Sequence, residues 1–309
     1  MYFSFSKPSL RFLFQLVLTI AAPFASKSQS EIVFLSDTQS PMLAEKIVLR
    51  ANQNIRATGM IFHCIIEQKP TSLMILGDVV SVGHKAKAWN NIDQYLDICR
   101  RKGIKVSALL GNHDVMTRPR KGETQFQKRF PNHNRIGYYQ IVDSVAVVFL
   151  NSNFSKLSAD DIQQQQTWFQ STLQSLDADP SVLVTIIACH HAPYTNSKIV
   201  SSSEKVRRYF VPDFIRSAKS RLFITGHSHN YEHFRNEGKD FLVIGGGGGL
   251  SQPVSTSEKT WHDLSATYKP EFHYLVVQLT HRELLVTSHF LKKDFSGFEK
   301  GRSFAIPIH

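Results

Sequence analysis

Residues 73–78 read Leu-Met-Ile-Leu-Gly-Asp, and residues 106–114 read Val-Ser-Ala-Leu-Leu-Gly-Asn-His-Asp. In each stretch a short apolar run ends at a glycine, and polar side chains follow the glycine directly. Because these runs do not alternate apolar with polar residues, both faces of each predicted strand must be covered by other parts of the chain. The pattern therefore favours an α/β fold with polar side chains gathered at strand ends.

The same strand pattern recurs along the chain, with helical patterns between several of the strands. Further strands are predicted at 32–35, 145–150, 182–188, 222–225 and 241–244, and helices at 44–56, 61–68, 87–101 and 159–176. Near the carboxyl terminus, 273–279 and 284–290 read as a hairpin around a polar turn at 280–283. Together these segments predict an α/β sandwich with sheets inside and helices outside.

The chain has 309 residues, of which 42% are hydrophobic and 20% charged, so it can bury a sizeable core. Lys7 and Arg11 precede an apolar run at 12–22, which predicts a cleaved signal peptide over 1–28 and a single domain over 29–309. This run is about half the roughly 20 residues that span a bilayer. We therefore expect a periplasmic or secreted protein that is not held in the membrane after cleavage.

The formal net charge of +11 favours anionic partners. The basic residues are scattered, and the densest group is Arg118, Arg120, Lys121, Lys128 and Arg129. Because no basic stripe is interleaved with aromatic residues, the sequence predicts a small phosphorylated substrate rather than specific nucleic-acid binding. The three cysteines are widely spaced among apolar neighbours and are expected to be buried and unpaired: Cys64, Cys99 and Cys189. The oligomeric state is not indicated.

Five predicted strands end in side chains that can bind metal. The strand ends are Ser36-Asp37-Thr38-Gln39, Gly77-Asp78, Gly111-Asn112-His113-Asp114, His190-His191-Ala192-Pro193 and Gly226-His227-Ser228-His229. Taken singly, each has an ordinary explanation as a helix cap, a tight turn or a hydrogen-bonded core histidine. In an open α/β sheet, however, ligands gather outside the carboxyl ends of the strands. All five ends in this order therefore predict one shared metal site.

This motif series resembles that of the calcineurin-like metallophosphoesterase superfamily, which runs Asp-x-His, Gly-Asp, Gly-Asn-His, His-x-Pro and Gly-His-x-His. The similarity covers nearly the whole predicted mature chain, and 191–197 and 226–232 are similar to the purple acid phosphatases. The resemblance implies a four-layer αββα sandwich of two mixed β-sheets flanked by helices. It also implies a phosphoric ester hydrolase that attacks its substrate with a metal-bridging hydroxide.

The resemblance further implies two divalent metal ions, Mn, Fe or Zn, with Mn favoured. Asp37 and His229 would bind the first ion, with Gln39 as a weaker ligand, either direct or through water. The carboxylate of Asp78 would bridge the two ions. The ligands implied for the second ion are Asn112, His191 and His227. His113 would protonate the departing oxygen or stabilise the charge that develops there.

Two residues depart from the family pattern. Gln39 stands where the first motif has His, as in the manganese-dependent ADP-ribose and CDP-alcohol diphosphatases, so a nucleotide-diphosphate pyrophosphatase is one alternative. Ser81 stands where most relatives have the Asp that orients the catalytic histidine and purple acid phosphatases have an iron-binding Tyr. We therefore expect another residue to orient His113 and assign this role to Asp114. A non-catalytic metal- or phosphate-binding protein of the same fold is the other alternative.

Two nearby features are expected to have structural roles. His190 precedes His191 on the same predicted strand, so its side chain should point to the opposite face and enter the core. The glycine run 245–249 opens no helix, and we interpret it as a turn where two backbones approach closely near the site.

Overall fold

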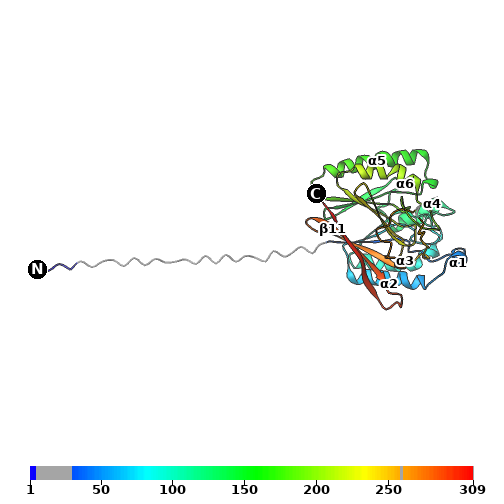
Figure 1. Ribbon diagram of the computed structural model, residues 1–309, viewed down its shortest axis with the longest axis horizontal. Helices are drawn as coiled ribbons and strands as arrows, with labels where there is room; N and C mark the ends of the chain where they lie inside the picture. Colours follow the sequence, from blue (N-terminus) through cyan, green and yellow to red (C-terminus); the bar gives the residue numbers. More distant parts are fainter. Residues whose placement is uncertain (5–29, 258–259, 309) are drawn as a thin grey trace.

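Two mixed β-sheets of six strands each form the centre of the molecule (Figure 1). The computed structural model describes residues 1–4, 30–257 and 260–308. The predicted signal peptide over 1–28 therefore lies outside the described residues, apart from the first four. Among the residues that are described, no helix is both long and apolar enough to cross a membrane.

The first sheet joins the amino-terminal strands to the carboxyl-terminal ones. Its strands, in spatial order, are β12 (Phe298–Pro307), β11 (Glu283–Leu291), β10 (His273–Leu279), β1 (Glu31–Leu35), β2 (Ser72–Ile75) and β3 (Lys105–Ala108). Strands β1, β2 and β3 run parallel, whereas β10 pairs antiparallel with β1. The predicted hairpin of β10 and β11 is confirmed, with Leu279 opposite Leu284 at its closed end. The carboxyl ends of β1, β2 and β3 consequently lie at one edge.

The second sheet is built from the middle of the chain. Its strands, in spatial order, are β4 (Tyr138–Val142), β5 (Val145–Phe149), β6 (Val184–Ala188), β7 (Ser220–Thr225), β9 (Lys239–Ile244) and β8 (Tyr231–Asn236). Strands β5, β6, β7 and β9 are parallel, and β4 and β8 pair antiparallel at the two sides. This sheet therefore also collects its parallel strand ends at one edge.

Helices cover the outer faces of both sheets. Helices α2 (Asn54–Gln68) and α3 (Asn90–Arg101) pack on the first sheet, and α5 (Ala159–Ala178), α6 (Glu204–Tyr209) and α7 (Val211–Arg216) pack on the second. The shorter α1 (Glu45–Val48), η1 (Ala86–Trp89) and η2 (Phe154–Lys156), and α4 (Pro119–Arg129), lie in the connections. The predicted four-layer αββα sandwich is confirmed.

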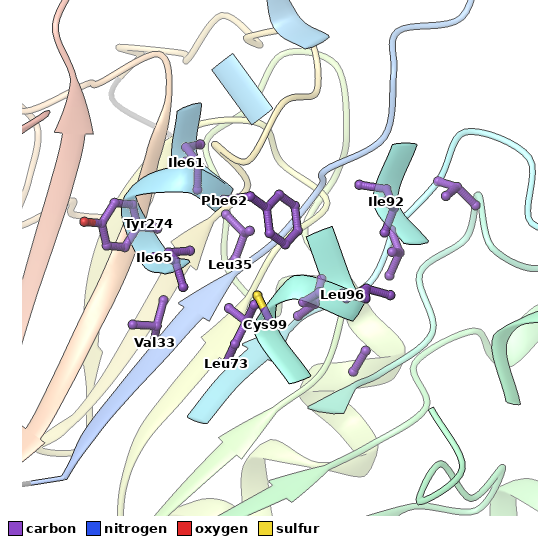
Figure 2. Close-up of a cluster of buried hydrophobic side chains, with 14 of the residues drawn as sticks. Val33, Leu35, Ile61, Phe62, Ile65, Leu73, Ile92, Leu96, Cys99 and Tyr274 are labelled. Atoms are coloured by element: carbon purple, nitrogen blue, oxygen red, sulfur yellow. The ribbon is translucent and has the colours of Figure 1, made fainter. Parts of the chain in front are cut away.

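Strand β1 shows why its sequence does not alternate. Val33 and Leu35 pack against α2 and α3, in the cluster drawn in Figure 2, whereas Ile32 and Phe34 pack against the second sheet. All four side chains are almost completely buried. Burial of both faces fixes the strand between two apolar layers, so the polar residues that follow it are held at a defined edge.

Several boundaries differ from the predictions. The predicted helices 44–56 and 61–68 are instead the single turn α1 and the longer α2, which continues through Gly59. Gly59 is accommodated because a Cβ there would lie 2.7 Å from the hydroxyl of Tyr95 on α3, so its absence lets the helices approach. Strands β4, β8 and β12 and helices α4, α6 and α7 were not predicted. Segments such as α4, whose only large apolar residue is Phe126, carry little hydrophobic periodicity.

Candidate metal centre

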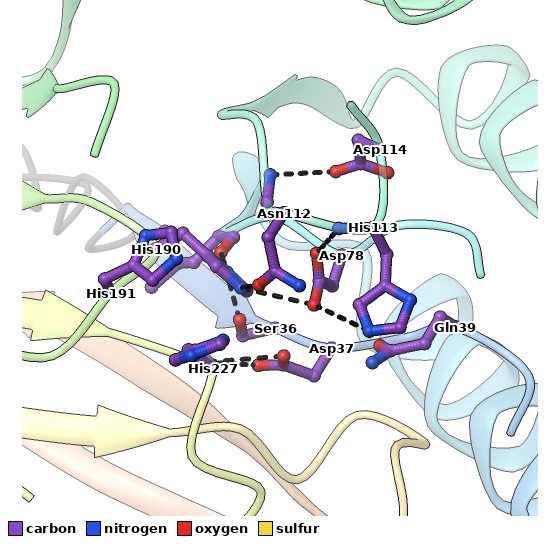
Figure 3. Close-up of polar contacts among 12 residues, drawn as sticks. Ser36, Asp37, Gln39, Asp78, Asn112, His113, Asp114, His190, His191 and His227 are labelled. Carbon is purple, nitrogen blue, oxygen red and sulfur yellow. Dashed lines mark hydrogen bonds and ion pairs between the residues drawn. The ribbon is translucent and has the colours of Figure 1, made fainter. Parts of the chain in front are cut away.

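All five predicted strand ends meet at one edge of the sandwich (Figure 3). The loops after β1, β2 and β3 come from the first sheet, and the loops after β6 and β7 come from the second. Hydrogen bonds join these loops: His227 N donates to Oδ2 of Asp37 across the two sheets at 3.0 Å, and Gly226 N donates to the carbonyl of His190 within the second sheet at 3.0 Å. Residues nearly 200 positions apart in the sequence are thus neighbours.

Three residues at this edge have strained backbones. Asp37, Asp78 and His227 adopt positive φ angles of 60°, 48° and 67°. A left-handed conformation is uncommon for residues other than glycine, and an unusual conformation of this kind costs of order 1–3 kcal/mol. Such strain is concentrated at functional sites, where the position of a side chain matters more than a relaxed backbone conformation. Here it directs two carboxylates and one imidazole into the same space.

His190 directs its Nε2 at oxygen atoms of two neighbouring residues. Its Nδ1 donates to the carbonyl of Leu76 at 2.8 Å, which leaves Nε2 3.2 Å from Oδ2 of Asp78 and 3.1 Å from Oδ1 of Asn112. Burial lowers the pKa of His190, but the Asp78 carboxylate outweighs burial and raises it to about 9. The same carboxylate would stabilise a metal cation that took the place of this proton.

His229 repeats this arrangement beside Asp37. Its Nδ1 donates to the carbonyl of Leu250 at 2.8 Å, and its Nε2 lies 3.3 Å from Oδ1 of Asp37. Gln39 completes the group. In the amide orientation that satisfies both of its ends, Nε2 donates to the carbonyls of Asp37 and Asp78, and Oε1 lies 3.3 Å from Nε2 of His229. The one metal-binding atom of Gln39 therefore faces the same space as Asp37 and His229.

Asp78 belongs to the same group as His190. Its Oδ1 accepts the main-chain N–H of His113 at 2.7 Å, and its Oδ2 faces His190. Ligand atoms of Asp78, His190 and His227 all lie within 4.8 Å of one another. Although burial opposes the charged form, the positive charge on His190 lowers the pKa of Asp78. A buried, ionised carboxylate beside these imidazoles is well placed to contact a cation.

The structure corrects the prediction for His190 and its neighbour. Strand β6 ends at Ala188 and the chain bends at His190 and His191, so the alternation assumed for a strand no longer applies. His190 is fully buried, but inside the site rather than in an apolar core. His191 also lies at the site, with its ring 4.5 Å from that of His227 and its Nδ1 2.8 Å from Oγ of Ser152. Burial lowers the pKa of His191 to about 3.

His113 is oriented differently from the prediction. Its Nδ1 donates to the main-chain carbonyl of Ser81 at 3.1 Å, which turns Nε2 towards Asp78 Oδ2 and Glu45 Oε1, at 3.9 and 3.7 Å. Asp114 does not orient this ring. Its carboxylate accepts the N–H groups of Gly111, Val79 and Val80 instead. These bonds anchor the loop that carries Asn112 and His113, which is a structural role.

The glycine run supports the first group of donors. Gly247 N and Gly249 N donate to the carbonyls of Ser36 and Asp37, at 2.9 Å in both cases. A Cβ on Gly249 would lie 2.4 Å from Cε1 of His229, so only glycine lets the imidazole lie against this segment. The expectation of a close-approach turn near the site is confirmed.

Sequence reasoning missed three contributors. His190 could have been found from the tandem His190-His191, since both rings follow the end of a strand. Ser152 and Glu45 carried no motif, and only the folded structure places them beside His191 and His113. Ser152 follows β5 at the same edge of the sheet, which is the one signal that its position offered.

The donor set fits metal ions. It contains imidazole nitrogens, carboxylate oxygens and amide oxygens without a thiolate, which suits Mn²⁺, Fe or Zn²⁺. The Nε2 atoms of His190 and His229 both face oxygen atoms, and a metal ion bound there would take the place of the Nε2 protons. Main-chain carbonyls fix both imidazole tautomers, as is usual for histidines that bind metal.

A family model described as calcineurin-like phosphoesterase matches residues 30–231. Among solved structures, a purple acid phosphatase from yellow lupin (Lupinus luteus) seeds is 17% identical, with a TM-score of 0.64. That match covers 91% of this chain but only 54% of the lupin chain, so the present chain spans about half the length of that relative. No match to a curated protein sequence reaches significance.

Two further structures share the fold. GAP50, described as the anchor in the inner membrane complex of Plasmodium, has a TM-score of 0.67 at 17% identity, covering 91% of this chain and 89% of its own. A dimetal phosphatase from Danio rerio has a TM-score of 0.55 at 12% identity, covering 91% and 99%. At these identities the likeness establishes the fold alone.

Proposed function

This chain belongs to the calcineurin-like phosphoesterase family, and from that premise we propose that it hydrolyses phosphate esters with two divalent metal ions. The family and the phosphatases of similar fold support a metal-dependent phosphoester hydrolase. The proposal goes further in assigning two ions, with Mn²⁺ favoured, to the two groups of donors, with Asp78 bridging the ions.

One observation carries the proposal: the two buried imidazoles of His190 and His229 each direct Nε2 at a carboxylate oxygen, of Asp78 and Asp37 respectively. His190, His227 and Asn112 would hold one ion with Asp78, and His191 borders that group. Asp37, Gln39 and His229 would hold the other. Two ions about 3.5–4 Å apart can bind phosphate oxygens and lower the pKa of a water for in-line attack.

The chain's own residues would complete the reaction. His113 is held by the Ser81 carbonyl with Nε2 turned into the site, where it can donate a proton to the departing oxygen. Asp114 anchors the loop that carries His113, and this anchoring holds the imidazole close to Asp78. Rigid placement of this kind contributes to rate because little reorganisation is needed during reaction.

Elemental analysis of the purified protein, combined with hydrolysis of nitrophenyl phosphate in added Mn²⁺, tests the function. We expect about two ions per chain and turnover that EDTA abolishes. Asp78→Asn should lose both metal and activity. Full activity in that variant, or in protein freed of metal, would exclude the proposed role of Asp78.

Gln39 favours a second substrate class, the phosphoanhydrides. Gln39 offers a neutral amide oxygen where the family has an imidazole nitrogen. The group of Asp37, Gln39 and His229 therefore has more hard oxygen ligands, which favours a hard ion such as Mn²⁺ or Mg²⁺. Side-by-side assays with nitrophenyl phosphate, bis-nitrophenyl phosphate and ADP-ribose separate monoesterase, diesterase and pyrophosphatase activities. A kcat/KM highest for ADP-ribose would select the pyrophosphatase alternative.

Gln39 and Ser81 together favour a third candidate, a non-catalytic binding protein. GAP50, whose fold is similar, is described as an anchor rather than as an enzyme. This alternative predicts substoichiometric metal and no turnover of any substrate in the panel. The complete set of other donors, all buried or half-buried at one edge, is the reason we rank it below hydrolysis.

We also propose that the protein is exported after removal of residues 1–28, on the strength of Lys7, Arg11 and the apolar run at 12–22. Amino-terminal sequencing of the mature protein from its source tests this. A mature chain that begins at residue 1 would exclude cleavage.

A further inference from the structure

A basic groove lies beside the proposed metal centre. It has a volume of about 930 Å³, and its walls come from the start of helix α4 and from the segment that precedes helix α5. Four exposed cationic residues line it: Arg118, Arg120, Lys121 and Lys156. These residues include most of the dense basic group noted in the sequence, which the proposed hydrolysis does not itself use.

None of the four cationic side chains has a carboxylate partner or a hydrogen bond within the part of the chain that the structure describes. The acidic residues nearby are already engaged. Arg135 lies 2.6 Å from Glu123 and 3.5 Å from Asp161, and Asp161 also caps helix α5 through Ser158. Arg135 balances one of these two carboxylates, so a single negative charge remains beside the four cations.

Stability of the fold does not explain where these cations lie. Arg118 is the N-cap residue of α4, and Arg120 and Lys121 lie in its first turn, which has no acidic residue and no side-chain cap. Positive charge at the amino end of a helix opposes the helix dipole and is mildly destabilising. Three cations at an unfavourable position, without partners and facing a groove, are instead suited to bind an anion that arrives from solution.

Both walls of the groove are tied to the metal centre. A Cβ on Gly122 would lie 2.1 Å from the carbonyl oxygen of Asp114, so α4 packs directly on the loop that carries Asn112 and His113. On the other wall, Ser155 is three residues beyond Ser152, whose hydroxyl contacts His191. Three residues span at most about 11 Å. The groove is therefore within reach of a group attached to a phosphate at the metal centre.

We propose that this groove binds a second anionic group of the substrate, so that the preferred substrates carry a further phosphate joined by a short linker to the one that is cleaved. This inference rests on the proposed function, since it assigns the substrate class of the same site. A substrate with a single phosphate would contact only the metal centre. A molecule with two phosphates would contact both the metal centre and the four cations.

Non-hydrolysable ligands test the inference without relying on turnover. Calorimetry on the Mn²⁺-supplemented full chain would compare the affinities of hexane-1,6-bisphosphonate and hexylphosphonate. Both ligands have P–C bonds in place of ester bonds, so a phosphoesterase does not cleave them. We expect the bisphosphonate to bind about 80-fold more tightly, because each of the four exposed cations contributes roughly threefold. The preference should weaken as salt screens the exposed charges.

Matched variants locate the effect. Lys121→Ala/Lys156→Ala should lower the preference for the bisphosphonate about tenfold, because Arg118 and Arg120 remain. Lys102→Ala/Lys105→Ala removes two exposed charges at the amino end of β3, opposite the site, and should keep it. An unchanged preference in the groove variant, or none in the wild type, would overturn the inference.

The two proposals fail separately. If the wild type hydrolyses no phosphoester but the preference falls in the groove variant, the hydrolase proposal is wrong and the anion site stands. If hydrolysis occurs but the preference is unchanged in the groove variant, the groove inference alone is wrong.

Discussion

Two main-chain carbonyls, those of Leu76 and Leu250, decide what His190 and His229 can do. Each carbonyl accepts the Nδ1 proton, so each imidazole turns its Nε2 towards a carboxylate. A histidine held in this way is a better metal ligand because its tautomer and ring orientation are fixed before the ion arrives. At the scale of single residues, the site is thus preorganised by backbone atoms that no motif records.

The tandem histidines should differ in their effect on metal binding. His190→Ala removes the Nε2 that faces Asp78 and Asn112, so metal content should fall by about one ion per chain under the two-ion scheme. His191 lies outside the group of Asp78, His190 and His227, whose ligand atoms are within 4.8 Å of one another, so His191→Ala should retain more metal and lose activity by about 10- to 100-fold. Elemental analysis of both variants checks the order, and the reverse order would reassign the ligand to His191.

Ser81→Ala should leave hydrolysis within about twofold of the wild type, whereas loss of an orienting side chain typically costs about 10- to 100-fold. The reason is that the main-chain carbonyl of Ser81, rather than its hydroxyl, accepts the Nδ1 proton of His113. Steady-state kcat/KM for nitrophenyl phosphate measures the effect. A loss above tenfold would mean that the hydroxyl contributes to the position of His113.

At the scale of elements, the short buried strands were predictable and the polar ones were not. The sequence predicts β1, β2, β5, β6 and β9 because both faces of each strand are apolar and a polar residue or glycine follows soon after its end. Strand β12 reads Phe-Glu-Lys-Gly-Arg-Ser-Phe-Ala-Ile-Pro and forms only because β11 offers it a partner. Pairing with a distant strand leaves little trace in local composition.

The site residues that lie at strand ends could be predicted as well as the strands themselves. Asp37, Asp78, Asn112, His227 and His229 all lie where parallel strands end, so topology alone predicted that they meet. The tandem His190-His191 marked both rings as candidates, but the bend at these two residues decides which ring faces Asp78, and the sequence does not show that bend. The Ser81 contact was equally hidden, since it uses a backbone atom that every residue possesses.

The loop after β9 provides the test at this scale. Gly249→Ala would place a Cβ 2.4 Å from Cε1 of His229, so the imidazole or the loop must shift. We expect Mn²⁺ affinity to fall by roughly 10- to 100-fold while the fold is retained, because overpacking of this size costs about 1–3 kcal/mol. Metal titration followed by circular dichroism measures both effects.

Gly59→Ala is the control for that experiment. Its new Cβ would meet only the hydroxyl of Tyr95, the end of a side chain that can move, and alanine favours the helical conformation of α2. Metal affinity should be unchanged. Equal losses of affinity in both variants would show that general destabilisation, rather than contact with His229, is responsible.

At the scale of the whole molecule, the two sheets divide the site between them. The loops of the first sheet supply Asp37, Gln39, Asp78, Asn112 and His113, and those of the second supply His190, His191, His227 and His229. Each group of donors therefore draws on both sheets. A bound ion would act as a cross-link between the two halves of the sandwich, in addition to the apolar layer that joins them.

Metal should consequently stabilise the entire fold. Ligand that binds only the native state at about 100 times its Kd adds about 2.7 kcal/mol, so saturating Mn²⁺ should raise Tm by roughly 5–10 °C over protein in EDTA. Asp78→Asn removes the carboxylate that faces His190 and His227, which we propose bridges the two ions, and its Tm should respond far less to Mn²⁺. Thermal unfolding by calorimetry, with and without metal, measures both. Equal Tm values for the wild type in Mn²⁺ and in EDTA would contradict a cross-link through the metal centre, because binding to the native state alone must raise Tm.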